Sequence, residues 1–187
     1  FGSAMDEAAS SIKEGVEIVA DGTQGKLNRD QVECLNIALS NIRRLNRLIG
    51  DILDISKIQS NLLKMEIVSC DIPEIVDQVY SFVRIEIEKR GLVLVTNLEN
   101  NLPAVIADRD RLMQVLINLL NNAVKFTRDN SKISLTCRRV SDDVEFSVAD
   151  QGPGIPPDEI SRLFGRFVQL DSTLVRRVGG TGLGLYI

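Results

Sequence analysis

The chain has 187 residues and a formal net charge of −4, with 44% hydrophobic and 26% charged residues. This balance is typical of a folded protein with its own core, and the negative charge argues against a nucleic-acid partner, which usually meets a basic face. Three cysteines far apart and the absence of histidine exclude histidine-containing metal sites and histidine bases, and argue against a disulfide scaffold. No stretch approaches the roughly 18 consecutive apolar residues of a membrane span.

The first part of the sequence predicts two helices joined by a turn. The opening FGSAM reads as a cloning remnant rather than a signal peptide, and a helix is expected over about 6–20. The polar stretch 21–28 contains two glycines and predicts a turn. Asn28, with Gln31 three residues later, is typical of a capping box that starts a second helix over about 29–63.

The second helix carries apolar residues at heptad spacing, which predicts a continuous seam. Two helices with one seam cannot close a core well alone, so we expect two copies of residues 1–64 to form a four-helix bundle in a homodimer. The alternative, in which the seam packs on the following domain of the same chain, stays open. The seam residues are Leu35, Ala38, Ile42, Leu45, Ile49 and Ile52.

The remainder, residues 65–187, mixes helices and strands. A strand within 66–71 leads into a helix over about 72–89, and Gly91 lies beyond its end. Further strands are expected at 92–98, within 100–108, and as a hairpin at 132–140 and 144–150, with a helix over about 108–126 between them. The fold class is therefore α+β, a helical hairpin followed by an α/β sandwich.

The helix over 111–127 separates polar from apolar residues. At about 100° per residue, its polar side chains fall within an arc of roughly 80°. Carboxamide oxygens suit Mg²⁺ and a lysine can hold a phosphate, although an ordinary solvated face would look the same. The polar residues are Gln114, Asn118, Asn122 and Lys125, and the apolar ones opposite are Leu112, Val115, Leu116, Leu119, Leu120 and Ala123.

A second candidate feature is the strand end VADQGPGI. Alternation places Asp150 on the same face as three apolar residues of its strand, so its carboxylate needs a partner. An exocyclic amine such as that of adenine is one such partner. The glycines at 152 and 154 allow a close approach of a ligand to the backbone. The simpler alternative is that Asp150 caps its own turn.

A third feature is the glycine-rich GGTGLGL. Gly180, Gly182 and Gly184 precede an apolar, helix-like run, which would let backbone N–H groups face an anion. The segment lacks the GK[ST] of a P-loop and does not open a βαβ unit. A flexible turn is the alternative.

Taken in order, these features resemble the sensor histidine kinases. NLLNNAVKFT resembles their N box, DQGPGI their G1 box, LFGRF their F box and GTGLGL their G2 box. LIGDILDISKIQSNLL is similar to the second helix of their dimerization and histidine-phosphotransfer domain. The resemblance extends from about residue 11 to residue 185 and implies a Bergerat (GHKL) sandwich that binds ATP and Mg²⁺.

The resemblance also implies roles for individual residues. Asn122, with Asn118 nearby, should hold Mg²⁺, Lys125 should contact phosphate, and Asp150 should receive the adenine amino group. Phe164 and Phe167 should anchor a lid over 168–179, where Arg176 and Arg177 either reach phosphate or form a solvated pair. The residues that should border the nucleotide are Gly152, Gly154, Ile155, Gly180, Thr181, Gly182, Leu183 and Gly184.

The sequence departs from the family at the phosphate acceptor. In the family, the γ-phosphoryl group moves to a histidine in an HE-x-RTPL segment of the first hairpin helix and then to an aspartate of a response regulator. Here the corresponding position falls near Ser3 and no histidine exists, so no catalytic residue is assigned and autophosphorylation is not expected. Truncation of the N-terminus is the favoured explanation, and a natural, non-catalytic nucleotide-binding scaffold is the alternative.

Two further expectations concern chemistry and location. Gln114 occupies the place where hydrolytic relatives of this fold carry a water-activating glutamate, and an amide cannot act as a general base, which favours a kinase over a free ATPase. The C-terminal GLYI reads as a helix start cut short. We expect this portion to be cytosolic, where ATP is, while attachment of the parent protein to the inner membrane stays open.

Overall fold

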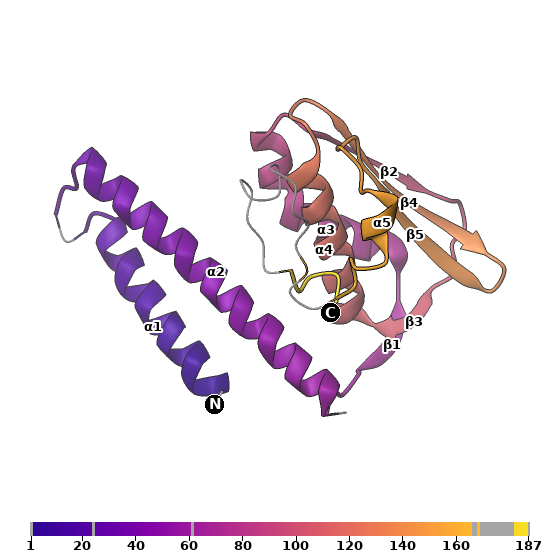
Figure 1. Ribbon diagram of the computed structural model, residues 1–187, viewed down its shortest axis with the longest axis horizontal. Helices are drawn as coiled ribbons and strands as arrows, with labels where there is room; N and C mark the ends of the chain where they lie inside the picture. Colours follow the sequence, from indigo (N-terminus) through magenta and orange to yellow (C-terminus); the bar gives the residue numbers. More distant parts are fainter. Residues whose placement is uncertain (1, 24, 61, 166–167, 169–181, 187) are drawn as a thin grey trace. The chain divides into compact units, whose positions relative to one another are not determined.

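The computed structural model describes residues 2–23, 25–60, 62–165, 168 and 182–186. The chain divides into two compact units, Phe1–Leu63 and Lys64–Ile187. The first consists of helices and the second combines helices with β-structure (Figure 1). The predicted α+β class is therefore confirmed. Among the described helices, none is both long enough and apolar enough to cross a membrane.

The first unit is an antiparallel hairpin of α1 (Gly2–Ala20) and α2 (Arg29–Gln59) (Figure 1). The predicted capping box is present at the start of α2. The Gln31 backbone N–H donates to Asn28 Oδ1 over 2.8 Å, and the Asn28 N–H donates to Gln31 Oε1 over 2.9 Å. These two bonds satisfy donors that a helix start otherwise leaves unpaired. The helix ends before the expected residue 63, because the Ser60 hydroxyl caps the carbonyl of Ser56 at 2.7 Å.

The predicted seam of α2 is only partly buried within one hairpin. Ile49 is buried, but Leu45 and Ile52 remain 47% and 52% exposed. Leu39 and Ile55, which the heptad pattern omits, are also buried. The hairpin therefore turns one stripe of α2 toward α1 and leaves a second apolar stripe exposed.

The second unit contains two small sheets. In one, two strands pair antiparallel. In the other, a central strand pairs parallel with one neighbour and antiparallel with the next, as the predicted hairpin requires. The two-stranded sheet consists of β1 (Ile67–Cys70) and β3 (Val105–Asp108), and the three-stranded sheet consists of β2 (Val93–Leu98), β4 (Lys132–Val140) and β5 (Asp143–Ala149).

Helices α3 (Ile72–Lys89) and α4 (Arg109–Phe126) lie side by side over the three-stranded sheet (Figure 1). A short helix, α5 (Pro157–Ile160), follows β5. The helices and sheet enclose one apolar core. Its most deeply buried members are Cys70, Ile72, Ile75, Val79, Leu116, Leu120, Ile133, Leu135 and Cys137.

The buried face of α4 differs from the predicted one at one position. Leu116, Leu120 and Ala123 are buried as expected, but Val115 is 46% exposed. On an α-helix Val115 lies only about 20° from Asn122, so it belongs beside the polar stripe rather than opposite to it. Val124, which is 3% exposed, completes the buried face instead.

Candidate functional site

Helix α4 is fixed at its N-terminus by Asp108. The Asp108 carboxylate accepts the backbone N–H of Glu66 at 2.9 Å and that of Arg111 at 3.1 Å. These two bonds, the Glu66 bond first, hold the pKa of Asp108 below its ordinary value. Because Glu66 directly precedes β1, the cap also ties α4 to the two-stranded sheet.

The predicted polar stripe runs along α4. Gln114, Asn118, Asn122 and Lys125 are all half-buried. Gln114 Oε1 accepts a hydrogen bond from Arg111 Nη1 at 2.7 Å. One face of the helix therefore presents two carboxamides one turn apart, followed by a cation.

The glycine-rich segment lies against this stripe. Asn118 Nδ2 donates to the carbonyl of Gly184 over 3.0 Å, although the two residues are 66 positions apart. Leu183 is fully buried, and Gly182 has a φ of +69°, which a residue with a side chain rarely adopts. The structure thus brings together the N-box-like and G2-box-like motifs, as the resemblance implies.

The strand-end aspartate lies near the C-terminal end of α4. Asp150 is exposed rather than buried, and its Oδ1 accepts the backbone N–H of Gly152 at 2.6 Å. The self-capping turn considered from the sequence is therefore present. A Cβ added at Gly152 would lie 3.0 Å from the carbonyl oxygen of Phe126 and 2.7 Å from Asp150 Oδ1, so this close approach requires glycine. Gly154 needs glycine for a different reason, since its φ is +74°.

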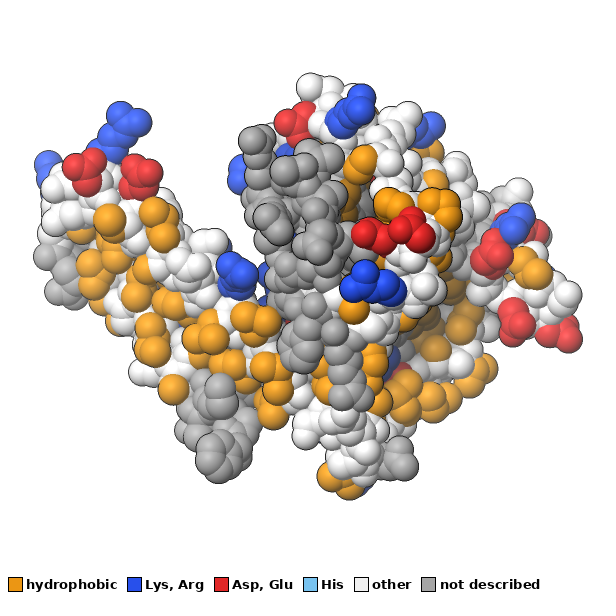
Figure 2. Space-filling model, viewed as in Figure 1, with side chains coloured by type: hydrophobic (Ala, Val, Ile, Leu, Met, Phe, Trp, Pro, Cys, Tyr) orange, Lys and Arg blue, Asp and Glu red, His pale blue; other side chains and the backbone are white. Residues whose placement is uncertain are grey.

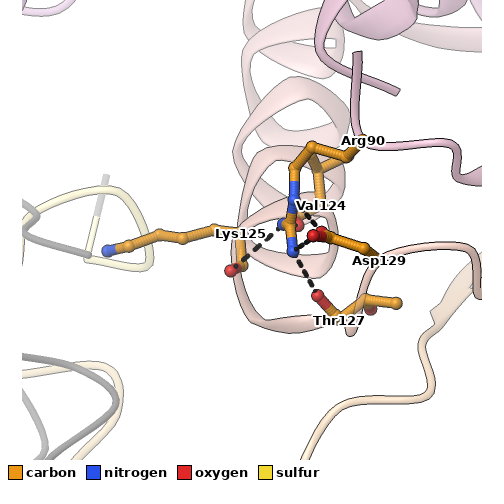
Figure 3. A network of polar contacts seen from close by, with 5 residues as sticks. All are labelled: Arg90, Val124, Lys125, Thr127 and Asp129. Carbon is orange, nitrogen blue, oxygen red and sulfur yellow. Dashed lines mark hydrogen bonds and ion pairs between the residues drawn. The ribbon is translucent and has the colours of Figure 1, made fainter. Parts of the chain in front are cut away.

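The remaining predicted residues are less constrained. Lys125 Nζ lies 4.7 Å from the centroid of the Phe126 ring, and its side chain extends outward from the end of α4 (Figure 3). Ile155 and Phe164 are 44% and 67% exposed. Predicted residues outside the described part of the chain are Phe167, Gly180, Thr181, Arg176, Arg177 and all of 169–179.

Two contacts at the site have no counterpart in the sequence reasoning. Gly152 packs against the backbone carbonyl of Phe126. The sequence could not predict this contact, because every residue has a backbone carbonyl and the residue type therefore carries no information about it. The Gln151 side chain accepts the Lys132 backbone N–H at 2.9 Å and so attaches the turn after β5 to the start of β4. In the sequence, only the position of the polar Gln151 within a strand-end turn indicates this hydrogen bond.

The arrangement is suited to a phosphorylated ligand with a polar base. The Asn118 carboxamide and the glycine-rich backbone meet near the middle of α4, whereas the Lys125 cation and the exposed Asp150 carboxylate lie near its C-terminal end. No cluster of three or more histidine, cysteine, aspartate or glutamate side chains occurs in the described ranges. The carboxamide oxygens of Asn118 and Asn122 are of the chemical kind that a hard cation such as Mg²⁺ accepts as ligands.

Comparison with known proteins agrees with this arrangement. Residues 107–187 match the family of histidine kinase-, DNA gyrase B-, and HSP90-like ATPases. The chain is 36% identical over 163 residues to the circadian input-output histidine kinase CikA of Synechococcus elongatus. The aligned region covers 86% of this chain and 22% of CikA. It therefore spans about a fifth of the length of this curated relative.

Solved structures give the same picture. Full-length ShkA, crystallised in complex with AMPPNP, superposes with a TM-score of 0.73 at 28% sequence identity. The match covers 97% of this chain and 39% of the ShkA chain. The catalytic domain of histidine kinase ThkA is 34% identical and matches 65% of this chain and 76% of its own, with a TM-score of 0.58. ThkA in complex with the response regulator TrrA matches 95% of this chain and 52% of its own, with a TM-score of 0.63 and 26% identity.

The resemblance drawn from the four sequence boxes is confirmed by these comparisons. The family model matches residues 107–187, and the ThkA catalytic domain, which covers 65% of this chain, is matched over 76% of its own length. The chain belongs to the histidine kinases, and its second unit is their ATP-binding catalytic domain, of the fold shared with DNA gyrase B and HSP90.

Proposed function

We propose that this chain binds Mg²⁺–ATP along the polar stripe of α4 and holds the γ-phosphoryl group for transfer to a histidine and then to a response-regulator aspartate. The observation that carries the proposal is the hydrogen bond from Asn118 to Gly184, which brings a carboxamide stripe and a glycine-rich backbone to one place. Two relatives support it, since ShkA was solved with AMPPNP, an ATP analogue, and ThkA with the response regulator TrrA.

In this proposal different groups around α4 bind different parts of the nucleotide. The Asp150 carboxylate accepts the adenine amino group, and the turn at Gly152 and Gly154 lets the base lie close to the backbone. Lys125 contacts phosphate. Other residues proposed to border the nucleotide or anchor the lid are Ile155, Phe164, Phe167, Gly180, Thr181, Gly182, Leu183 and Gly184.

Mg²⁺ fits the carboxamides proposed to hold it. Asn118 donates to Gly184 through its nitrogen, which leaves its oxygen able to accept or to ligate. Asn122 lies one turn further along the same face. Magnesium favours oxygen ligands together with phosphates, and when bound it would neutralise charge on the phosphate oxygens. Asn118 and Asn122 are accordingly the proposed metal residues.

The chemistry we propose is phosphoryl transfer rather than rapid hydrolysis. Gln114 offers an amide that accepts a hydrogen bond from Arg111, and an amide cannot remove a proton from water. Transfer to an imidazole depends mainly on positioning and charge stabilisation, which the site can supply. We therefore expect this chain to bind ATP and to hydrolyse it very slowly.

The absence of histidine from these 187 residues favours a second candidate function, a non-catalytic nucleotide-binding module. The two candidates differ in what happens when a histidine-bearing hairpin is offered as a separate protein with radiolabelled Mg²⁺–ATP. Labelling of the hairpin supports the kinase. Intact ATP binding without any labelling supports the regulatory module.

We also propose that the hairpin forms a homodimer. Leu45 and Ile52 are seven residues apart on α2 and are both about half exposed within one copy. Apolar side chains continue along the hairpin surface (Figure 2). A heptad-spaced apolar stripe of this kind is what a second helical hairpin would cover in a four-helix bundle.

The test of the ATP site is a titration with a fluorescent ATP analogue in the presence of Mg²⁺. Asp150→Asn keeps an oxygen for the Gly152 N–H but loses the charge that would bind the adenine amine, so affinity should fall about tenfold or more. Asp143→Asn, at the opposite end of β5, is the matched control and should bind as the wild type does. Equal affinities for wild type and Asp150→Asn would overturn the site assignment.

A further inference from the structure

Arg90, which follows α3, makes a network of contacts with the end of α4 (Figure 3). Its Nη1 donates to the carbonyl of Val124 and, at 3.4 Å, to that of Lys125. Its Nη2 donates to the Thr127 carbonyl at 2.7 Å. Its Nε donates to Asp129 Oδ1 at 2.8 Å. One guanidinium thus joins three backbone carbonyls and one carboxylate.

These contacts occupy groups that the helix cannot satisfy by itself. The last carbonyls of an α-helix have no intrahelical donor and carry the negative end of the helix dipole. A planar guanidinium can serve several of them at once, whereas an ammonium ion acts as a point charge. The Arg90 side chain is only 25% exposed, while that of Asp129 is 65% exposed. The guanidinium is therefore largely protected from solvent, and the carboxylate is not.

The same turn of α4 carries two groups of the ATP site. Lys125 belongs to it, and Figure 3 shows its side chain extending away from the guanidinium that holds its carbonyl. Phe126 follows, and its carbonyl is the surface against which Gly152 and the Asp150 turn pack. A shift of this turn would therefore move the proposed phosphate contact and the support of the adenine contact together.

We propose that Arg90 is a positioning residue for nucleotide binding. It holds the last turn of α4 so that Lys125 reaches the phosphates and Phe126 supports the Gly152 turn, and it does not itself touch the nucleotide. This inference rests on the proposed ATP site. It adds a residue from outside the four sequence boxes to the determinants of ATP affinity.

The test is a double-mutant cycle between Arg90→Gln and Lys125→Gln, read as affinity for Mg²⁺–ATP and for adenosine. Arg90→Gln should weaken ATP binding about tenfold and adenosine binding less, because the phosphate contact is lost with the position of Lys125. In the Lys125→Gln background the same change should cost much less ATP affinity. Thermal unfolding is followed in parallel, so that every affinity is measured below the transition.

The matched control is Arg138→Gln. Arg138 forms an exposed ion pair with Glu145 at 2.7 Å on β4 and β5, and its loss should leave ATP affinity unchanged. Arg90→Lys keeps a cation at the helix end, and it provides a second test if Arg90→Gln fails to fold. It should lose ATP affinity with the same dependence on Lys125, because a point charge cannot hold three carbonyls.

Equal losses of ATP affinity with and without Lys125, or equal losses for ATP and adenosine, would overturn the positioning role. A failure of the ATP site itself looks different. In that case Asp150→Asn also leaves ATP binding unchanged, whereas a wrong assignment of Arg90 alone leaves the Asp150→Asn effect intact.

Discussion

The two units of this chain bury their helices to very different degrees. In the second unit, α3 has 18 residues and six of them are buried apolar side chains. In the hairpin, α2 has 31 residues and only three are buried. Apolar burial is the main favourable contribution to folding, so the catalytic unit has its own core, whereas α2 buries few apolar side chains within one copy of the hairpin.

This difference in apolar burial fits the different roles proposed for the two units. A domain that binds ATP needs a rigid platform, and α4 provides it by burying one face and presenting polar groups on the other. The proposed dimer would need an exposed apolar stripe on the hairpin, and Leu45 and Ile52 are exposed apolar residues at heptad spacing. Four measurements can break or sharpen this comparison.

The largest contrast is expected in cysteine reactivity. Cys34 of the hairpin is exposed, whereas Cys137 on β4 is fully buried, and burial raises the pKa of the Cys137 thiol to about 11. Thiolates are the reactive form, and a buried thiol reacts only when the unit opens, so iodoacetamide at pH 8 should label Cys137 about a thousand times more slowly than Cys34. Mass spectrometry of peptides measures both rates. Loss of the fast phase in Cys34→Ser is the control, and similar rates at both sites would contradict the comparison.

The next effect is a loss of stability confined to the catalytic unit. Leu120 is fully buried, so Leu120→Ala should lower the free energy of unfolding by about 3 kcal/mol. Urea denaturation, followed by hydrogen exchange of α3 and α4, measures this change. Val115→Ala on the same helix is the control and should lower it by less than about 1 kcal/mol, because Val115 is 46% exposed. Similar losses for the two variants would mean that the core is not where the structure places it.

A smaller effect is expected on association of the hairpin. Leu45→Asp places a charge in the exposed heptad stripe and should raise the dimer dissociation constant about tenfold or more. Sedimentation equilibrium over a range of protein concentrations measures this constant. Ser40→Asp adds the same charge to an exposed position of α2 outside the seam and should leave association unchanged. A monomeric wild type at high concentration would remove the dimer proposal altogether.

The smallest effect concerns pH, since the two units cap their helices differently. Asn28 caps α2 without charge, whereas Asp108 caps α4 as a carboxylate whose pKa is lowered by the backbone N–H groups of Glu66 and Arg111. The stabilisation from Asp108 is present above the pKa of the unfolded carboxyl and is lost as pH falls through its lower folded value. Asp108→Asn should lower the Tm of the catalytic unit by about 2–5 °C at pH 7.

Below about pH 4 the Tm difference between wild type and Asp108→Asn should shrink, because the wild-type carboxyl becomes neutral as well. Calorimetry from pH 7 to pH 3 measures it, with Asp143→Asn as the control that should show no such convergence. A Tm difference that stays constant over this range would contradict a charge-dependent cap.

Local structure was predictable because it depends on residues that are close in the sequence. The capping box joins Asn28 and Gln31, which are three positions apart, and the amphipathic pattern of α3 and α4 repeats every turn. The helix ends and strand positions therefore follow from the sequence to within a few residues. The exception is Val115, which was placed on the buried face although helix periodicity sets it about 20° from Asn122, and it is 46% exposed.

The sequence by itself determined the elements other than the short helix α5, their order and, through the four boxes, the family and its ATP-binding fold. Only the tertiary structure decided which distant atoms meet: Asn118 with Gly184, the Phe126 carbonyl with Gly152, and Arg90 with the end of α4. It also decided that Leu45 stays exposed within one hairpin while Leu120 is buried. The physical reason is that local hydrogen bonds and helix periodicity act over a few residues, whereas contacts between distant residues depend on how whole elements pack.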